Sequence, residues 1–404
     1  MSNKEERKAP VLRFKGFTDD WEQRKLKELA IFNPKDNLPE EFEYVDLESV
    51  IGTEMLSHKK TALSDAPSRA QRLAKKGDIF YQTVRPYQKN DYLFDKDAEN
   101  YVFSTGYAQI RPKINGNFLF QLLRTERFVK KVLNECTGTS YPAINSKDLS
   151  NIKVSYTNYK EEQRSIGSLL DNLDNLVALQ QRKLNELKEV KKTLLSQLFP
   201  SKGQYRPIIR FKKFTNKWTK RKLGNIAKII GGGTPSTSNH DYWNGNINWY
   251  SPTEIGNNIF VNSSNKKISI KGLNNSSAKL LPGGKTILFT SRAGIGNMAI
   301  MLTDGCTNQG FQSWVIDDTK IDIYFLYSLG RLLKHDAIRQ ASGSTFLEIS
   351  NKEVKKLLLE IPSFTEQKLI GNMLRKIDDD IVRQKERIIL ITKIKKNLLQ
   401  KLFV

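Results

Sequence analysis

Residues 10–30 read PVLRFKGFTDDWEQRKLKELA, and residues 207–227 read PIIRFKKFTNKWTKRKLGNIA. Both stretches carry the pattern R-F-x-x-F-T-x-x-W-x-x-R-K-L, which starts at Arg13 and again at Arg210. A second shared pattern, E-Q-x-x-I-G, starts at Glu162 and again at Glu366. Two copies of one long unit predict a single chain that imitates a two-fold dimer.

The composition indicates a polyanionic partner. The chain has 404 residues, enough for two domains with full cores, and a formal net charge of +23. A pI near 9.7 favours nucleic acid, because a strongly basic chain attracts polyanions. We expect no membrane partner, since no apolar run in the sequence reaches the length that spans a bilayer. The charged N-terminal stretch is unlike a signal peptide, so we expect a cytoplasmic protein.

The two cysteines, Cys136 and Cys306, stand at non-equivalent places in the two halves. They are too few for a metal cage or a disulfide framework. We therefore expect both to be reduced, buried and structural.

Each half ends in a long pattern whose seam positions alternate spacings of four and three. The first seam comprises Ile166, Leu170, Leu173, Val177, Gln180, Leu184, Leu187, Lys191, Leu194 and Leu198. The second comprises Ile370, Leu374, Ile377, Ile381, Gln384, Ile388, Ile391, Lys395, Leu398 and Leu402. Heptad seams of this regularity indicate helices that pair with a long partner. The short, proline-bounded connection at residues 200–207 favours an antiparallel pair that keeps two globules apart, whereas the alternative is that each helix packs on its own globule.

These features predict an α+β protein with pseudo-two-fold symmetry. Two tandem α/β domains are separated by two long antiparallel coiled-coil helices. The predicted boundaries are 1–158 for the N-terminal domain, 159–199 for the central helix, 200–207 for the linker, 208–361 for the C-terminal domain and 362–404 for the distal helix.

A search for a catalytic or metal-binding constellation finds none that is complete. Gly284-Lys285-Thr286 ends like a phosphate loop, but Lys279 stands where the first glycine is required. The glycines at 231–233 are followed by Thr-Pro-Ser, where a cofactor loop would open a helix. Asn33-Pro34 lacks the second proline and the aromatic residue of amino-methyltransferases. The three histidines are isolated, so we expect no catalytic residue and no metal.

Two arginines follow apolar runs that are typical of strands. Arg85 follows residues 79–81, Ile-Phe-Tyr, and Arg292 follows residues 287–289, Ile-Leu-Phe. Each arginine has a threonine two residues before it, so we expect the two to occupy equivalent positions. An arginine at a strand end can reach a phosphate or a guanine edge, although a solvated or ion-paired arginine would give the same pattern.

Short polar stretches repeat together with these arginines, at 104–107 and 308–311 and at 137–141 and 342–346. Their hydroxyl and backbone N–H groups suit phosphate, although turn formation alone selects the same residue types. The candidate DNA-contacting residues are Gln82, Thr83, Arg85, Tyr87, Thr105, Ser140 and Tyr141 in the first half, and Thr234, Ser236, Thr290, Ser291, Arg292, Asn308, Gln309, Ser344 and Thr345 in the second.

The chain resembles the specificity subunit of Type I restriction-modification enzymes. The resemblance rests on the R-F-x-x-F-x-x-x-W opening of each half, the G-G-T-P-S-T segment at 232–237 and the two E-Q-x-x-I-G patterns. It implies a target recognition domain in each half and a helical spacer that docks two modification subunits. The resemblance also implies that those partners bind AdoMet and methylate adenine N6, and that restriction subunits use ATP and Mg²⁺. The first half has no clear counterpart of the G-G-T-P segment.

Because the two halves share a frame but differ in their loops, we expect an asymmetric, bipartite double-stranded DNA site. The chain itself is then non-catalytic and binds no cofactor. Two alternatives remain open at this point: a stand-alone sequence-specific DNA-binding protein, and an enzyme with a cryptic nuclease or methyltransferase site.

Overall fold

The computed structural model describes residues 9–201, 203–292, 294–343 and 347–404. The chain divides into two compact units: unit 1 comprises residues 1–183 and 384–404, and unit 2 comprises residues 184–383. Two long helices, α5 (Lys160–Gln197) and α10 (Phe364–Leu402), each contribute residues to both units. Within the described ranges, no helix is both long and apolar enough to cross a membrane.

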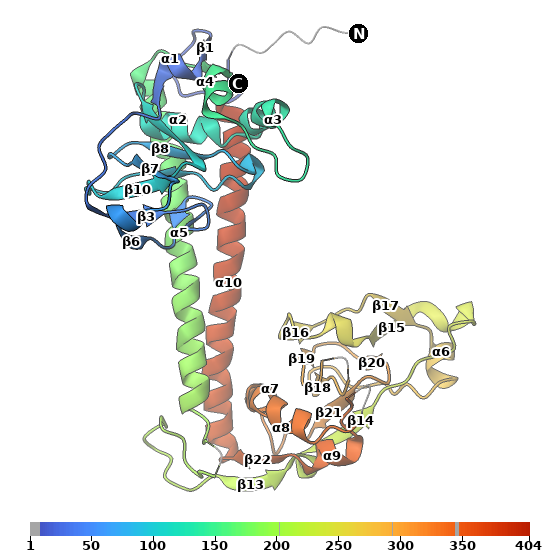
Figure 1. Cartoon of the computed structure of the whole chain (residues 1–404). Helices are drawn as coiled ribbons and strands as arrows, with labels where there is room; N and C mark the ends of the chain where they lie inside the picture. The colour runs from blue at the N-terminus through green and yellow to red at the C-terminus, as the bar shows by residue number, and fades with distance from the viewer. Residues whose placement is uncertain (1–8, 202, 293, 344–346) are drawn as a thin grey trace. The chain divides into compact units, whose positions relative to one another are not determined.

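Unit 1 is built on two four-stranded sheets (Figure 1). The first has the order β2 (Ala30–Phe32), β11 (Tyr107–Pro112), β8 (Ile79–Gln82) and β9 (Tyr92–Leu93). The second has the order β6 (Lys59–Ala62), β3 (Glu41–Val45), β10 (Tyr101–Ser104) and β7 (Ala70–Leu73). Smaller elements complete the unit: the pair β1 (Glu22–Lys25) and β12 (Lys153–Tyr156), the pair β4 (Val50–Ile51) and β5 (Glu54–Met55), the α-helices α1 (Leu26–Leu29), α2 (Gly116–Leu123), α3 (Glu126–Glu135) and α4 (Ser146–Asn151), and the 3₁₀ turns η1 (Leu63–Asp65) and η2 (Pro86–Gln88).

Unit 2 repeats this plan with a larger main sheet. Its main sheet has the order β14 (Ala227–Gly231), β21 (Gln312–Ile316), β18 (Thr286–Phe289), β19 (Met298–Met301) and β16 (Phe260–Val261). A three-stranded sheet has the order β17 (Lys266–Ile268), β15 (Trp243–Tyr250) and β20 (Gly305–Thr307). The remaining elements are the pair β13 (Thr219–Lys222) and β22 (Leu358–Ile361), the α-helices α6 (Ile270–Asn274), α7 (Ile323–Leu332), α8 (Lys334–Arg339) and α9 (Asn351–Lys356), and the turns η3 (Leu223–Asn225), η4 (His240–Tyr242) and η5 (Pro252–Glu254).

The sheet pairings confirm the repeat that the sequence predicts. Antiparallel strands β2, β11 and β8 of unit 1 correspond to β14, β21 and β18 of unit 2. Each unit also contains parallel pairing, of β3 with β10 in unit 1 and of β15 with β20 and β16 with β19 in unit 2. The two halves therefore share one frame.

The repeated glutamate and arginine join each long helix to the start of its own half. In unit 1 the Arg13 guanidinium donates to both oxygens of Glu162, at 2.7 and 3.0 Å. In unit 2 Arg210 donates to Glu366 in the same way, at 2.7 and 2.8 Å. Both carboxylates are almost fully buried. Two parallel charge-assisted hydrogen bonds fix the geometry of each junction.

The glutamine and glycine of the same pattern hold the long helix against a second helix. Asn115 is the N-cap of α2, and the Gln163 side-chain carbonyl accepts a hydrogen bond from its backbone N–H at 3.0 Å. The Gln367 carbonyl accepts in the same way from Asp322, the N-cap of α7, at 3.0 Å. A Cβ atom on Gly167 would lie 2.8 Å from the backbone nitrogen of Phe118 in α2, so only glycine allows α5 to approach α2 this closely.

Each core is closed by the end of the helix that starts in the other half. Trp21 of unit 1 packs edge-on against Phe403, which follows α10, with ring centroids 6.0 Å apart. Trp218 of unit 2 packs edge-on against Phe199, which follows α5, at 6.2 Å. All four rings are buried. The first core is therefore completed by residues from the far end of the sequence.

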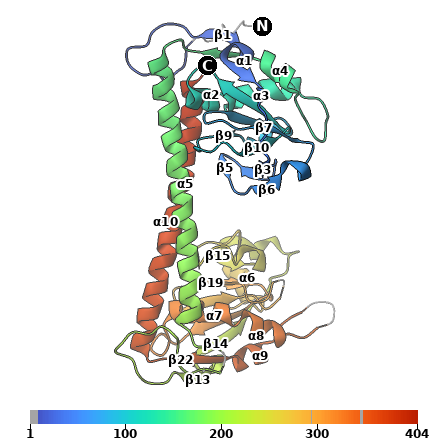
Figure 2. The same cartoon turned by 60° about the vertical axis from the view of Figure 1, so that its left-hand side comes forward.

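Within each unit, α5 and α10 lie side by side and run antiparallel (Figures 1 and 2). In unit 1 Asp174 pairs with Lys395, and Gln384 donates a hydrogen bond to the Gln180 side chain at 2.6 Å. In unit 2 Lys191 pairs with Asp378. Pairing confirms the prediction of an antiparallel helix pair, including the polar seam positions. The aspartates are the partners that the seam alone does not identify.

Candidate nucleic-acid interface

The end of β8 brings three segments of the first half together. The backbone N–H of Thr83 donates to the Gly106 carbonyl at 3.0 Å, and the Thr83 carbonyl accepts from the N–H of Ile144 at 3.0 Å. The Thr83 hydroxyl also donates to the Gly106 carbonyl, at 2.8 Å. Gln82 and Thr83 are buried, so they hold this edge together from the inside.

Arg85 is held in an unusual backbone conformation at this edge. Its φ is 54°, in the left-handed region that non-glycine residues seldom adopt, and its N–H donates to the Pro142 carbonyl at 2.7 Å. Its guanidinium lies 4.3 Å from the centroid of the Tyr141 ring. No acceptor for this guanidinium is found among the described residues. Tyr141 and Tyr87 are exposed, whereas Arg85 is half-buried.

A buried carboxyl group supports this edge from behind. The Asp91 carboxyl accepts a hydrogen bond from the backbone N–H of Gln82 at 2.8 Å. Burial raises the pKa of Asp91 to about 7, and the nearby Arg124 and Lys89 oppose that rise. The Gln82 side chain donates to the Val84 carbonyl at 2.7 Å. No sequence pattern points to Asp91, because a lone aspartate between polar residues is typical of a surface turn.

The second half builds the same edge with different side chains. The N–H of Ser291 donates to the Gly310 carbonyl at 2.8 Å, and the Ser291 carbonyl accepts from Ile349 at 3.0 Å. Thr290 forms a bridge to Phe311, as Gln82 does to Tyr107. Like their counterparts in the first half, Thr290 and Ser291 are buried.

This strand pairing corrects the expected match between the two arginines. Ser291 occupies the position of Thr83, so Arg292 corresponds to Val84 and not to Arg85. The threonine two residues before each arginine suggested equivalence, but the bridge from Thr290 to Phe311 sets the register one residue earlier. The two arginines therefore lie on equivalent strand edges, at positions that differ by one residue.

Arg292 lies beside a different set of polar groups. The Asn308 side-chain carbonyl accepts from the N–H of Gly310 at 2.8 Å, as the Ser104 hydroxyl does for Gly106 at 3.2 Å. A Cβ atom on Gly310 would lie 3.5 Å from Nε of Arg292. In the part of the chain that the structure describes, no carboxylate or other acceptor pairs with the Arg292 guanidinium.

The G-G-T-P segment packs against this same edge. The Thr234 hydroxyl donates to the side-chain carbonyl of Gln309, and the N–H of Gly233 donates to the Thr307 carbonyl at 2.8 Å. A Cβ atom on Gly232 would lie 2.0 Å from the Asn308 carbonyl oxygen, so the glycine is required sterically. The structure thus brings Thr234, Arg292, Asn308 and Gln309 together.

The first half lacks this segment because its edge strand stops earlier. β2 ends at Phe32, and Asn33 turns away with a φ of 45°. The Asn33 side chain accepts from the N–H of Gln109 at 3.0 Å, which ends the ladder. β14 instead continues along β21 to Gly231.

The remaining predicted residues are less clustered. Thr105 is half-buried and its N–H donates to the Arg69 carbonyl at 2.8 Å, while Ser140 is exposed beside Tyr141. Ser236 is exposed, and its carbonyl accepts from the Trp243 indole N–H at 3.0 Å. Ser344 and Thr345 lie outside the described residues.

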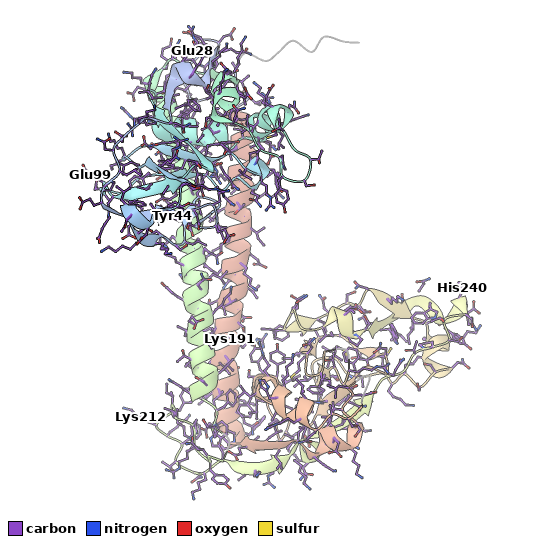
Figure 3. The ribbon with its side chains drawn as sticks, in the orientation of Figure 1. Glu28, Tyr44, Glu99, Lys191, Lys212 and His240 are labelled. Carbon is purple, nitrogen blue, oxygen red and sulfur yellow. The ribbon has the colours of Figure 1, made fainter. Side chains whose placement is uncertain are left out.

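The histidines and acidic groups do not assemble a metal site. His58 pairs with Glu43 at 2.7 Å, and His240 lies in η4 of unit 2 (Figure 3). Over the described ranges, no group of three or more His, Cys, Asp or Glu residues could hold a metal ion.

The family model named Type I restriction modification DNA specificity domain matches the chain twice, at residues 18–189 and 215–392. The MjaIX specificity subunit of Methanocaldococcus jannaschii, a Type I restriction enzyme subunit, is 32% identical over 195 residues, which cover 48% of this chain and 45% of that relative. The HindI specificity subunit of Haemophilus influenzae is 22% identical over 393 residues, covering 79% of this chain and 84% of that relative.

Two solved structures share the fold over nearly the whole chain. The S subunit of a Type I restriction-modification system from M. genitalium has a TM-score of 0.66 at 16% identity and covers 98% of this chain and 99% of that one. A chain from a Type I restriction-modification assembly has a TM-score of 0.56 at 22% identity, with the same coverage. The chain therefore belongs to the Type I restriction-modification DNA specificity family.

Proposed function

We propose that this chain selects the DNA sequence on which a Type I restriction-modification complex acts. Each unit binds one short part of a bipartite site in double-stranded DNA. Because the two edges carry different side chains, the two parts of the site differ in sequence.

The observation that carries this proposal is the pair of equivalent edges with an available arginine on each. Arg85 stands beside exposed tyrosines, whereas Arg292 stands beside Asn308 and Gln309. Arginine favours guanine and amide side chains favour adenine in the major groove, each good bidentate contact being worth about 1–3 kcal/mol. Different neighbours therefore favour different bases.

The net charge of +23 supports binding to the DNA backbone. Basic side chains that neutralise phosphates release counterions, so affinity should fall steeply with salt. These phosphate contacts add affinity without sequence preference. The sequence preference comes from the two strand edges.

We further propose that the chemistry belongs to partner subunits. Modification subunits that bind AdoMet would dock on the paired helices and methylate adenine N6, and restriction subunits would use ATP and Mg²⁺. The chain itself would supply no cofactor for these reactions and would work in the cytoplasm, beside the chromosome.

Mapping of methylated adenines across a genome tests this assignment. The chain is co-expressed with the modification subunits of its own system, as the wild type and as the Arg85→Ala and Arg292→Ala variants. We expect one bipartite motif for the wild type, with each variant relaxing a different part of it. Arg24→Ala, an exposed arginine paired with Glu22, serves as the control and should leave the motif unchanged.

Two outcomes contradict the proposal. A methylation pattern that is the same with and without the chain would exclude a role in site selection. Tight sequence-selective DNA binding by the chain alone, with no association with modification subunits, would instead favour a stand-alone DNA-binding protein.

A further inference from the structure

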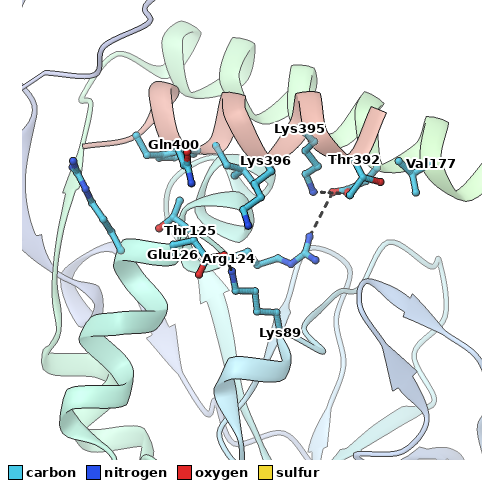
Figure 4. A pocket seen from close by; sticks show the side chains of 13 residues that line it. Lys89, Arg124, Thr125, Glu126, Val177, Thr392, Lys395, Lys396 and Gln400 are labelled. Carbon is cyan, nitrogen blue, oxygen red and sulfur yellow. Dashed lines mark hydrogen bonds and ion pairs between the residues drawn. The ribbon is translucent and has the colours of Figure 1, made fainter. Parts of the chain in front are cut away.

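A cavity of about 550 Å³ opens in unit 1 between α3 and the two long helices (Figure 4). Its cationic lining comes from three elements that are distant in the sequence. The five cations are Lys89, Arg124, Arg127, Lys395 and Lys396. Only two carboxylates, Glu126 and Asp174, line the same space.

The carboxylates do not satisfy all of these cations. Glu126 pairs with Lys89 at 2.9 Å, and Asp174 pairs with Lys395. Lys396 and Arg127 have no hydrogen-bond or ion-pair partner within the described part of the chain. The cavity therefore has an excess of positive charge.

Arg124, one of the lining residues, has two buried donor atoms without an acceptor. Nε and Nη1 of Arg124 are inaccessible to solvent and have no hydrogen-bond partner among the described residues. Nη1 lies 3.7 Å from Asp174, an ion-pair distance that is too long for a hydrogen bond. Burial, with Arg124 nearby, lowers the pKa of Lys395 to about 8. An anion in this cavity would relieve the repulsion between its cations.

The cavity also has room and apolar surface for more than a phosphate group. Val177, Leu399 and Phe403 line it together with the cations. Its volume falls in the range of small-molecule sites, which combine apolar walls with a few convergent polar groups. A ligand that combines phosphate groups with a larger body fits both features.

Around the aspartate that corresponds to Asp174, the second half has aromatic side chains. Asp378 corresponds to Asp174, and the Tyr324 hydroxyl donates to it at 2.7 Å. The Tyr324 ring packs against Phe260, with centroids 5.9 Å apart. Lys192 corresponds to Lys396 but pairs with Glu189 at 3.7 Å. The second half therefore differs from the first around this aspartate and this lysine.

We propose that this cavity binds a small phosphorylated ligand of nucleotide size. Lys396 and Arg127 contact its phosphate groups, Arg124 adds positive charge beside them, and the apolar side chains hold its body. The inference goes beyond DNA recognition and does not depend on it.

Calorimetric titration of the full chain with pyrophosphate, and separately with ADP, tests the site. We expect one saturable site, with at least tenfold weaker binding in Lys396→Ala and in Arg127→Ala, because each loses a charge-assisted contact to the phosphate groups. Lys396→Arg should retain most of the affinity. Lys192→Ala is the matched control from the second half and should bind as the wild type does. Thermal melts of each variant show whether it is folded.

The proposal is overturned if neither probe binds at a saturable site, or if Lys396→Ala and Arg127→Ala bind as tightly as Lys192→Ala. It is also overturned if the two substitutions weaken the binding of duplex DNA but not the binding of pyrophosphate or ADP. Lys396 and Arg127 would then contact the DNA backbone. Failure of the methylation test at Arg85 would leave the pyrophosphate result unaffected, so the two proposals fail separately.

Discussion

The ends of β8 and β18 make the same backbone hydrogen bonds but satisfy one shared donor differently. The N–H of Gln82 donates to the buried carboxyl of Asp91, at 2.8 Å, whereas the N–H of Thr290 donates to the Asn297 carbonyl, at 3.0 Å. The Asp91 carboxyl can gain or lose a proton, whereas the Asn297 backbone carbonyl cannot. Duplication has kept the ladder while leaving the groups behind it free to change, so the two edges should respond differently to their surroundings.

The largest expected effect is on how the free energy of unfolding of unit 1 depends on pH. The Asp91→Asn substitution should remove this dependence. With a folded-state pKa of about 7, Asp91 stays protonated after the unfolded chain has ionised near pH 4. Wild-type unit 1 should therefore lose on the order of 4 kcal/mol between pH 4 and pH 7 through this group. Urea unfolding across this range should show a gap between variant and wild type that grows from near zero at pH 4. A constant gap would contradict the assignment.

The paired helices offer the next test, because the aspartates Asp174 and Asp378 have different numbers of partners. Lys191→Met would leave Asp378 with only Tyr324 among its described partners and should cost about 3 kcal/mol. Lys395→Met should cost less, because Asp174 keeps Gln121 as a donor at 2.8 Å and Arg124 as a nearby cation. Denaturation followed by circular dichroism compares the two variants. Equal losses would mean that the extra partners of Asp174 contribute little.

The glycines of the G-G-T-P segment test the feature that only the second half possesses. Gly232→Ala should destabilise unit 2 by about 2–3 kcal/mol, because its Cβ would overlap backbone oxygens. Gly231→Ala is the matched control, since its Cβ would meet neighbours only at ordinary distances of 3.7 Å or more. Hydrogen exchange of β14 and β21 measures the effect. Loss of protection in both variants would show that the steric argument is insufficient.

The smallest expected effect concerns the ring beneath Arg85. Tyr141→Ala removes a cation–π contact worth about 0.5–1 kcal/mol at an exposed site, so binding to the first half-site should weaken a few-fold. Fluorescence anisotropy with DNA altered in one half-site at a time measures this change. Tyr205→Ala, an exposed tyrosine of unit 2, should not alter it. Equal weakening at both half-sites would contradict a local role for Tyr141.

The helices were predictable because their signal is periodic. The polar seam residues Gln180, Lys191, Gln384 and Lys395 were identified at their seam positions, and each lies in the helix pair. The aspartate partners of the two lysines are not evident from the sequence, because Asp174 and Asp378 stand next to seam positions and have the pattern of solvent-facing charges. A heptad template specifies which residues face a partner helix, but it does not specify what a long lysine side chain will reach.

The sequence predicts where the strand edges at the ends of β8 and β18 lie, but not which of their side chains face inward. Repeated turn residues located the strand ends, yet Gln82, Thr83, Thr290 and Ser291 face inward, because each satisfies backbone groups of neighbouring segments. The register that separates Arg292 from Arg85 depends on pairing with β21, which is distant in the sequence. DNA contact by the predicted residues remains a prediction that the methylation map will decide.

The burial of Leu402 and Phe403 in the first core has a consequence for synthesis. The ribosome makes Trp21 and Phe118 early, but the residues that cover them emerge only after the whole of unit 2. During that interval the first unit exposes an apolar surface that chaperones or other nascent chains can bind. A stop codon before Leu402 should therefore impair the domain that was translated first, and expression trials should favour a tag that leaves Phe403 free to dock.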